Sequence, residues 1–113
     1  MEQRESEKGL QIYFDLQDLV ENSLACLLIL RSDSSNKAAF LKLLQTVQRI
    51  KIAVDNLSMF RVFEYISEVE SLLRVLQRGE ITLTEEILFS LYQSIESLSR
   101  IVKNLPQKDV NFQ

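Results

Sequence analysis

The chain has no histidine, no tryptophan, one cysteine, one proline and two glycines among its 113 residues. Without histidine or a second cysteine, it cannot assemble the ligand sets that are typical of protein zinc sites. Cys26 has no partner for an internal disulfide and lies in an apolar run, so it is either a buried structural thiol or a reactive one. The scarcity of glycine and proline favours long helices over a β fold with many turns.

The composition is that of one globular domain, with 46% hydrophobic and 26% charged residues. The net charge of −3 gives no basic surplus, so we expect no nucleic-acid partner. The longest apolar run, Leu24–Leu30, is much shorter than the roughly 20 residues that span a bilayer. Residues 1–8 are charged throughout, unlike a signal peptide. We therefore expect a soluble cytoplasmic protein with no membrane partner.

Four segments have the apolar spacing of amphipathic helices: about 10–31, 37–55, 59–78 and 85–105. The expected core stripes are Leu16, Leu19, Val20, Leu24, Leu27 and Leu28; Phe40, Leu43, Leu44, Val47, Ile50 and Val54; Val62, Ile66, Val69, Leu73 and Leu76; and Ile87, Leu88, Leu91, Ile95, Leu98, Val102 and Leu105. Short links between such helices predict an all-α fold, an antiparallel up-down-up-down four-helix bundle.

Capping residues separate the segments. Residues 32–36 are a turn cluster, Ser58 is the expected N-cap of the third helix, and Gly79 is placed like a C-cap glycine. For the fourth helix, Thr82 with Glu85 fits a capping box, while Thr84 is an equal alternative. Pro106 follows the end of that helix. The expected organisation is a charged segment at 1–9, a bundle at 10–105 and a polar tail at 106–113.

Several stretches of the chain are similar to one known family. They are Tyr13-Phe14-Asp15 before a leucine-rich helix, Gln48-Arg49-Ile50-Lys51-Ile52-Ala53-Val54, Glu70 with Leu72-Leu73, Arg78-Gly79-Glu80-Ile81, and Leu83-Thr84-Glu85-Glu86-Ile87. Together they resemble the histidine phosphotransfer (HPt) domain of CheA-type chemotaxis kinases. The resemblance extends from Tyr13 to Leu105 and implies an HPt-like bundle that acts in two-component signalling.

The resemblance also shows where this chain departs from the family. Gln48 occupies the place of the phosphoacceptor histidine, and an amide has no basic nitrogen with which to accept a phosphoryl group. Lys51 matches the lysine that neutralises the phosphoryl group, and Glu70 matches the glutamate that orients the histidine. Ile52 and Ala53 replace small residues that let a partner approach. The resemblance therefore implies a degenerate, non-catalytic form. Separately, because the chain has no histidine, no second cysteine and no glycine-rich phosphate loop, we expect no metal and no cofactor.

The surface around Gln48 is the candidate partner-binding site. Gln48 is either a solvated helix residue or part of a docking surface, and Leu41 and Ile52 are either exposed contact residues or core. Lys51, Glu70 and Ser67 are expected beside it, although each has an ordinary reading as a surface residue. The partner-binding candidates are Leu41, Gln45, Gln48, Ile52, Asp55 and Phe63.

Two further features of the sequence are the aromatic residues at 60–65 and the apolar run in the first helix. Phe60, Phe63 and Tyr65 are most simply core aromatics, with a ligand pocket as the alternative. The run Leu24–Leu30 is apolar on every side of its helix, so either another chain or a loop is expected to cover it.

These observations lead to one favoured function and two alternatives. The favoured one is a protein-interaction module that binds a response-regulator receiver or histidine-kinase domain without accepting phosphate. The second is phosphotransfer through another residue, which is disfavoured because Ser and Thr esters lack the high-energy N–P bond. The third is a structural bundle that self-associates, as a homodimer through the first helix.

Overall fold

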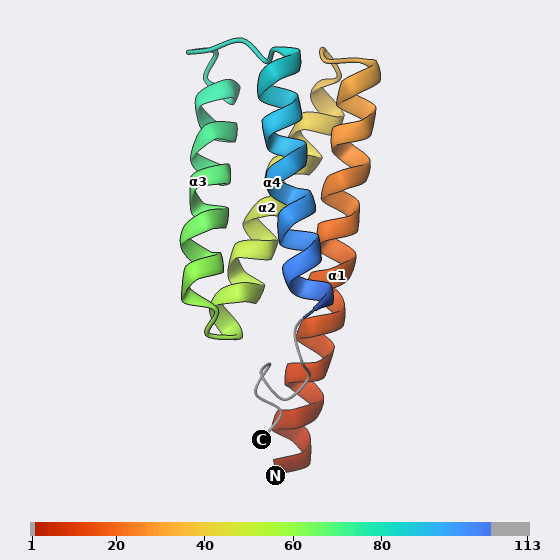
Figure 1. Cartoon of the computed structure of the whole chain (residues 1–113), viewed down its shortest axis with the longest axis vertical. Helices are drawn as coiled ribbons and strands as arrows, with labels where there is room; N and C mark the ends of the chain where they lie inside the picture. Colours follow the sequence, from red (N-terminus) through yellow and green to blue (C-terminus); the bar gives the residue numbers. More distant parts are fainter. Residues whose placement is uncertain (1, 105–113) are drawn as a thin grey trace.

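Four α-helices account for nearly all of the described chain (Figure 1). The computed structural model describes the backbone of residues 2–104 and the side chains of residues 10–104. The helices are α1 (Glu2–Ser32), α2 (Lys37–Asn56), α3 (Phe60–Gln77) and α4 (Glu85–Lys103). No strand occurs in residues 2–104, so the prediction of an all-helical chain with four helices is confirmed.

The helices lie side by side, and each turns back along the one before it (Figure 1). α1 packs against both α2 and α4, α2 packs against α3, and α3 and α4 have the smallest contact. The Tyr13 hydroxyl on α1 donates a hydrogen bond of 2.9 Å to the carbonyl oxygen of Val102 on α4. This bond joins the N-terminal half of α1 to the C-terminal end of α4.

The core forms where the four apolar stripes meet. Its side chains with less than 2% exposure include residues of every helix: Leu16, Val20, Leu27 and Leu30; Leu43, Val47, Ile50 and Val54; Ile66 and Leu73; Ile95 and Leu98. Cys26 is buried in the same core, and this burial raises the pKa of its thiol. A buried structural thiol is therefore the reading that the structure supports.

α1 differs from its sequence-based prediction in two ways. It begins at Glu2 rather than near Leu10. Residues 2–8 contain no apolar periodicity from which a helix could be predicted. Glu, Gln, Arg and Lys are nevertheless good helix formers, so their intrinsic helix propensity extends α1 to Glu2. Leu28, expected in the core stripe, is exposed. The run Leu24–Leu30 has apolar residues on every side of α1, but the other helices cover only one side of it.

The link between α2 and α3 corrects the assignment of Ser58. Ser58 is not an N-cap; the capping position of α3 is Met59, which has no side-chain cap. Ser58 instead has φ 57° and follows the C-cap of α2. Its N–H donates to the carbonyl of Asp55, and the N–H of Met59 donates to the carbonyl of Val54. This pair of bonds is a Schellman motif, which requires a left-handed residue at this position.

The other helix ends follow the sequence more closely. The side chain of Asn36 accepts the N–H of Ala39 at 2.9 Å and caps α2. Gly79 has φ 75° in a second Schellman motif after α3, as its position predicted. Of the two candidates for α4, Thr84 is the N-cap, and its hydroxyl accepts the N–H of Ile87 at 3.2 Å.

The expectation of core aromatics at the start of α3 is partly wrong. Phe60 is exposed, because the first turn of α3 lies at the end of the bundle, where no helix covers that side. Phe63 packs against the core, and Tyr65 is exposed at its edge. Leu105, Pro106 and the tail 106–113 lie outside the described residues.

Candidate functional site

The outward face of α2 carries a straight line of side chains. Residues spaced by alternating steps of four and three lie on one side of a helix, and α2 has such a line in Leu41, Gln45, Gln48, Ile52 and Asp55. All are exposed except Gln48, which is half-buried. The structure therefore places every partner-binding candidate of α2 on one surface.

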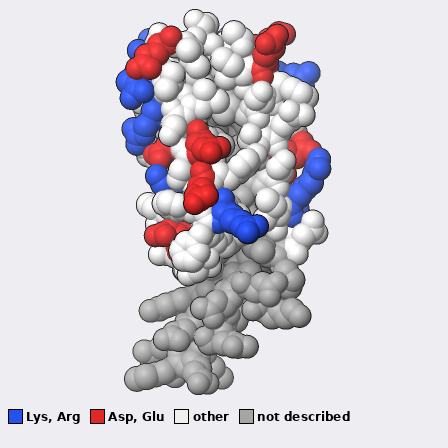
Figure 2. All heavy atoms as spheres, turned by 60° about the vertical axis from the view of Figure 1, so that its left-hand side comes forward, with Lys and Arg blue, Asp and Glu red and all other residues white. Residues whose placement is uncertain are grey.

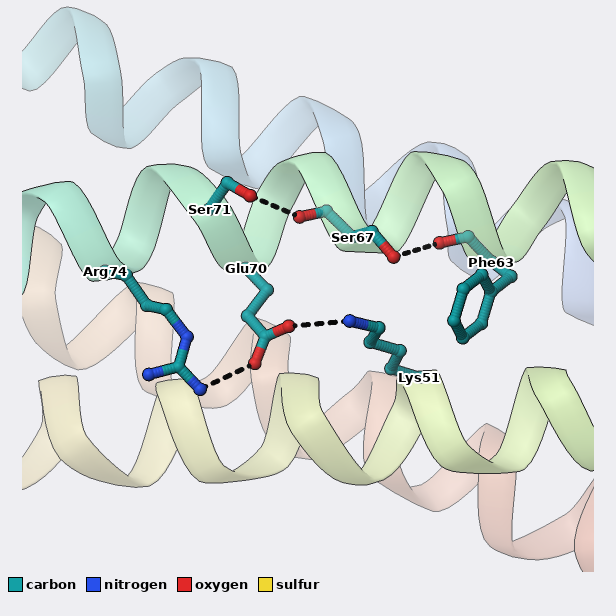
Figure 3. A network of polar contacts seen from close by, with 6 residues as sticks. All are labelled: Lys51, Phe63, Ser67, Glu70, Ser71 and Arg74. Atoms are coloured by element: carbon teal, nitrogen blue, oxygen red, sulfur yellow. Dashed lines mark hydrogen bonds and ion pairs between the residues drawn. The ribbon is translucent and has the colours of Figure 1, made fainter.

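An ion pair joins α2 to α3 next to this line (Figure 3). The Lys51 ammonium lies 3.1 Å from Oε1 of Glu70, and the Arg74 guanidinium lies 3.0 Å from Oε2 of the same carboxylate. Glu70 projects from α3 toward α2, and its side chain is only 11% exposed. Each carboxylate oxygen is thus satisfied by a separate cation.

The cluster fixes the charge state of Glu70. Burial favours the neutral acid, but hydrogen bonds from Lys51 and Arg74 and the positive charge of Lys51 hold the pKa of Glu70 below its ordinary value. The nearby Gln48 side chain adds a smaller lowering of this pKa. Glu70 is therefore ionised at neutral pH, and the cluster has one net positive charge.

Gln48 lies beside Glu70 and is partly open to solvent. It is neither sealed in the core nor remote from the ion pair. Its amide can donate and accept hydrogen bonds, but it cannot form a phosphoramidate. The position can therefore take part in recognition and cannot act as a nucleophile.

Two other candidates play local roles. The Ser67 hydroxyl donates to the carbonyl oxygen of Phe63 within α3 at 2.7 Å, so Ser67 is not part of the ion-pair cluster (Figure 3). The Phe63 ring has the Lys51 ammonium 5.3 Å from its centroid, within the range of a cation–π contact. Phe63 and Glu70 together hold the lysine in place.

The large apolar side chains on this face are open to solvent. Leu41 is 47% exposed and Ile52 is 63% exposed, which excludes the reading that both are core. They lie roughly 16 Å apart along α2, on either side of Gln48. Ile52 also borders a shallow groove of about 230 Å³ between α1 and α2, with Ile12, Leu19, Arg49 and Ala53 among its other lining residues.

One member of the cluster was missed by the sequence-based site prediction. Arg74 binds the Glu70 carboxylate but was not among the predicted site residues. The available signal was its i,i+4 spacing from Glu70, which puts an acid and a base one turn apart.

Charged groups are unevenly spread on the side of the molecule where α3 lies. Figure 2 shows several basic groups along its left edge, acidic groups nearer its middle, and wide uncharged areas between them. Within the described residues, no group of acidic or cysteine side chains has the geometry to hold a metal ion. Residues 2–104 also contain no helix that is both long and apolar enough to cross a membrane.

Comparison with protein-family models, curated proteins and solved structures finds no match to this chain. The resemblance to phosphotransfer domains therefore depends on the residues quoted above.

Proposed function

We propose that this chain is a phosphotransfer-like protein-interaction module that accepts no phosphate and is not an enzyme. Its fold is an HPt-like, antiparallel up-down-up-down bundle, and its partner is a response-regulator receiver or histidine-kinase domain of a cytoplasmic, chemotaxis-type signalling pathway. The direction of successive helices in Figure 1 supports this fold.

One observation carries the proposal. Gln48 lies beside the Lys51–Glu70 pair, in the middle of an exposed surface bounded by Leu41 and Ile52. Exposed large apolar groups around a polar centre are typical of protein contacts. A nucleophile is missing from that centre, so the surface supports recognition without transfer.

The ion pair has a positioning role in this proposal. Because Glu70 is held by two cations and Lys51 is also in contact with Phe63, the polar centre is rigid before a partner arrives. A rigid surface loses less side-chain entropy on binding. The exposed edges of Lys51 and Arg74 favour a partner surface with acidic groups.

To test the proposal, the affinity of the chain for receiver and kinase domains from the same genome is measured by isothermal titration calorimetry. Leu41→Asp and Ile52→Asp are each expected to weaken binding about tenfold or more, because they place a charge in an apolar contact. Ile101→Asp on α4 is the matched control, since Ile101 is similarly exposed but lies on another helix. No binding to any such domain, or an equal loss with the control, would refute the proposal.

Phosphate acceptance is tested separately with an active histidine kinase and labelled ATP. We expect no acid-labile label on the chain. Label at any residue would show that the module is a phosphoacceptor and would refute the non-catalytic assignment.

The alternative of a self-associating structural bundle has one observation in its favour. Leu28 and Ile29 on α1 are exposed, and no loop within residues 10–104 covers them. If no signalling partner binds, this surface gives the next function to test.

A further inference from the structure

A groove runs between the second half of α1 and the first half of α4, away from the Gln48 surface. Its volume is about 410 Å³, and its apolar floor includes the buried side chains of Leu27 and Leu88. Leu28 forms part of one wall, while Phe89 and Tyr92 form part of the other. The groove is therefore apolar at its centre.

The walls of this groove are unusually open for such apolar groups. Leu28 is 51% exposed and Phe89 is 61% exposed. Ala25 and Ile29, one turn of α1 from each other, are also exposed next to Leu28 and extend the apolar area around the helix. A patch of this kind, with a hollow and a protruding ring side by side, marks an interaction surface.

The rim of the groove has one charge of each sign. Arg31 lies on the α1 wall and Glu85 on the α4 wall, near the same end of the groove. Within residues 10–104 neither side chain forms an ion pair. The two walls therefore have opposite charge and similar apolar content.

We infer that this groove is the contact surface for a second copy of the chain. A two-fold axis parallel to α1 and α4 brings the α1 wall of one copy onto the α4 wall of the other. Leu28 of each copy then meets Phe89 of the other, and Arg31 meets Glu85, with both contacts made twice. An isologous interface needs this self-complementarity, and the patch supplies it.

The size of the patch sets the expected strength. The exposed parts of Leu28 and Phe89 amount to roughly 200 Å² per copy, whereas a stable interface of standard size buries about 800 Å² per partner. The dimer is therefore expected to be weak, with a Kd of about 10 µM to 1 mM. Such a dimer leaves the α2 surface free, so it is compatible with the proposed function and does not depend on it.

Sedimentation equilibrium of the full chain, from about 1 µM to about 1 mM, measures the association. Phe89→Asp is expected to weaken it about tenfold or more, because a charge replaces the central apolar contact. Phe60→Asp on α3 is the matched control, since Phe60 is a similarly exposed aromatic residue (69%) that lies outside the groove; the control dimer is expected to be unchanged.

Charge reversal tests the geometry of the pairing. Arg31→Glu alone and Glu85→Arg alone are each expected to be monomeric, because like charges then meet across both walls. A mixture of the two variants is expected to form a heterodimer, since every meeting pair is again of opposite sign. A chain that stays monomeric at about 1 mM, a dimer insensitive to Phe89→Asp, or variants that fail to associate on mixing would each overturn the inference.

Discussion

Ser58 is a serine in a backbone conformation that favours glycine, and this gives a sharp prediction about stability. Two Schellman motifs end helices within residues 2–104, one with Ser58 at φ 57° and one with Gly79 at φ 75°. A side chain with a Cβ in the left-handed region costs roughly 1–2 kcal/mol. The same motif is thus strained after α2 and relaxed after α3.

The expected magnitude follows from two opposing terms. Ser58→Gly removes a strain of roughly 1–2 kcal/mol, but glycine gains about 0.5–1 kcal/mol of conformational freedom in the unfolded chain. The net stabilisation is therefore about 0.5–1 kcal/mol. Gly79→Ala should destabilise by a similar amount, because a Cβ there would meet no atom within 4 Å and only the backbone term remains.

Urea unfolding followed by circular dichroism measures both changes. With a slope of about 1–2 kcal/mol/M, each variant is expected to move the midpoint by roughly 0.5 M, in opposite directions. Ser58→Ala is the control, since it keeps the Cβ and removes only the hydroxyl; its midpoint is expected to stay close to that of the unaltered chain. If Ser58→Gly lowers the midpoint, the assignment of strain to this residue is wrong.

Three further predictions concern single contacts. Glu70→Gln should cost about 1–2 kcal/mol at neutral pH by leaving its two cations without a carboxylate. Because the folded state lowers the pKa of Glu70, this contribution is present above its ordinary value of 4.5 and is lost as the pH falls through the lower folded value, so the stabilities of the two proteins in urea should converge in acid. Thr84→Ala should cost about 1 kcal/mol through loss of the N-cap, whereas Thr82→Ala should be neutral; equal effects in thermal unfolding would contradict the cap assignment. Tyr13→Phe should cost about 1 kcal/mol by removing the hydrogen bond from the hydroxyl to the Val102 carbonyl, and an unchanged melting temperature would show that the bond contributes nothing.

The helices and most of their boundaries could be predicted because they depend on local rules. Apolar spacing gave the core residues of α2, α3 and α4, and the positions of Gly79 and the turn cluster before α2 gave two of the ends. The start of α1 was missed because residues 2–8 favour a helix through their intrinsic propensity alone and have no apolar spacing that would reveal it. Ser58 was wrongly predicted as an N-cap because serine is a common N-cap residue. In this short link it instead follows the C-cap of α2, a position where glycine is more usual.

The site was predictable in its positions and not in its contacts. Helical spacing put Gln48 and Ile52 on one face of α2, but their exposure depended on which faces the neighbouring helices cover. Ser67 shares a face with Glu70, yet its hydroxyl bonds to its own helix, which is a choice among nearby acceptors. Residue spacing along a helix shows which side chains share a face, but it does not show which acceptor a side chain binds or whether a neighbouring helix covers it.

The sequence by itself determined an all-helical chain with no imidazole and no pair of thiols, because these follow from composition and from the period of its apolar residues. Only the tertiary structure decided that Glu70 is held by both Lys51 and Arg74, and that Leu41 and Ile52 remain in solvent. The physical reason is that burial and ion pairing depend on distances between helices, and those distances are set by how all four helices pack together.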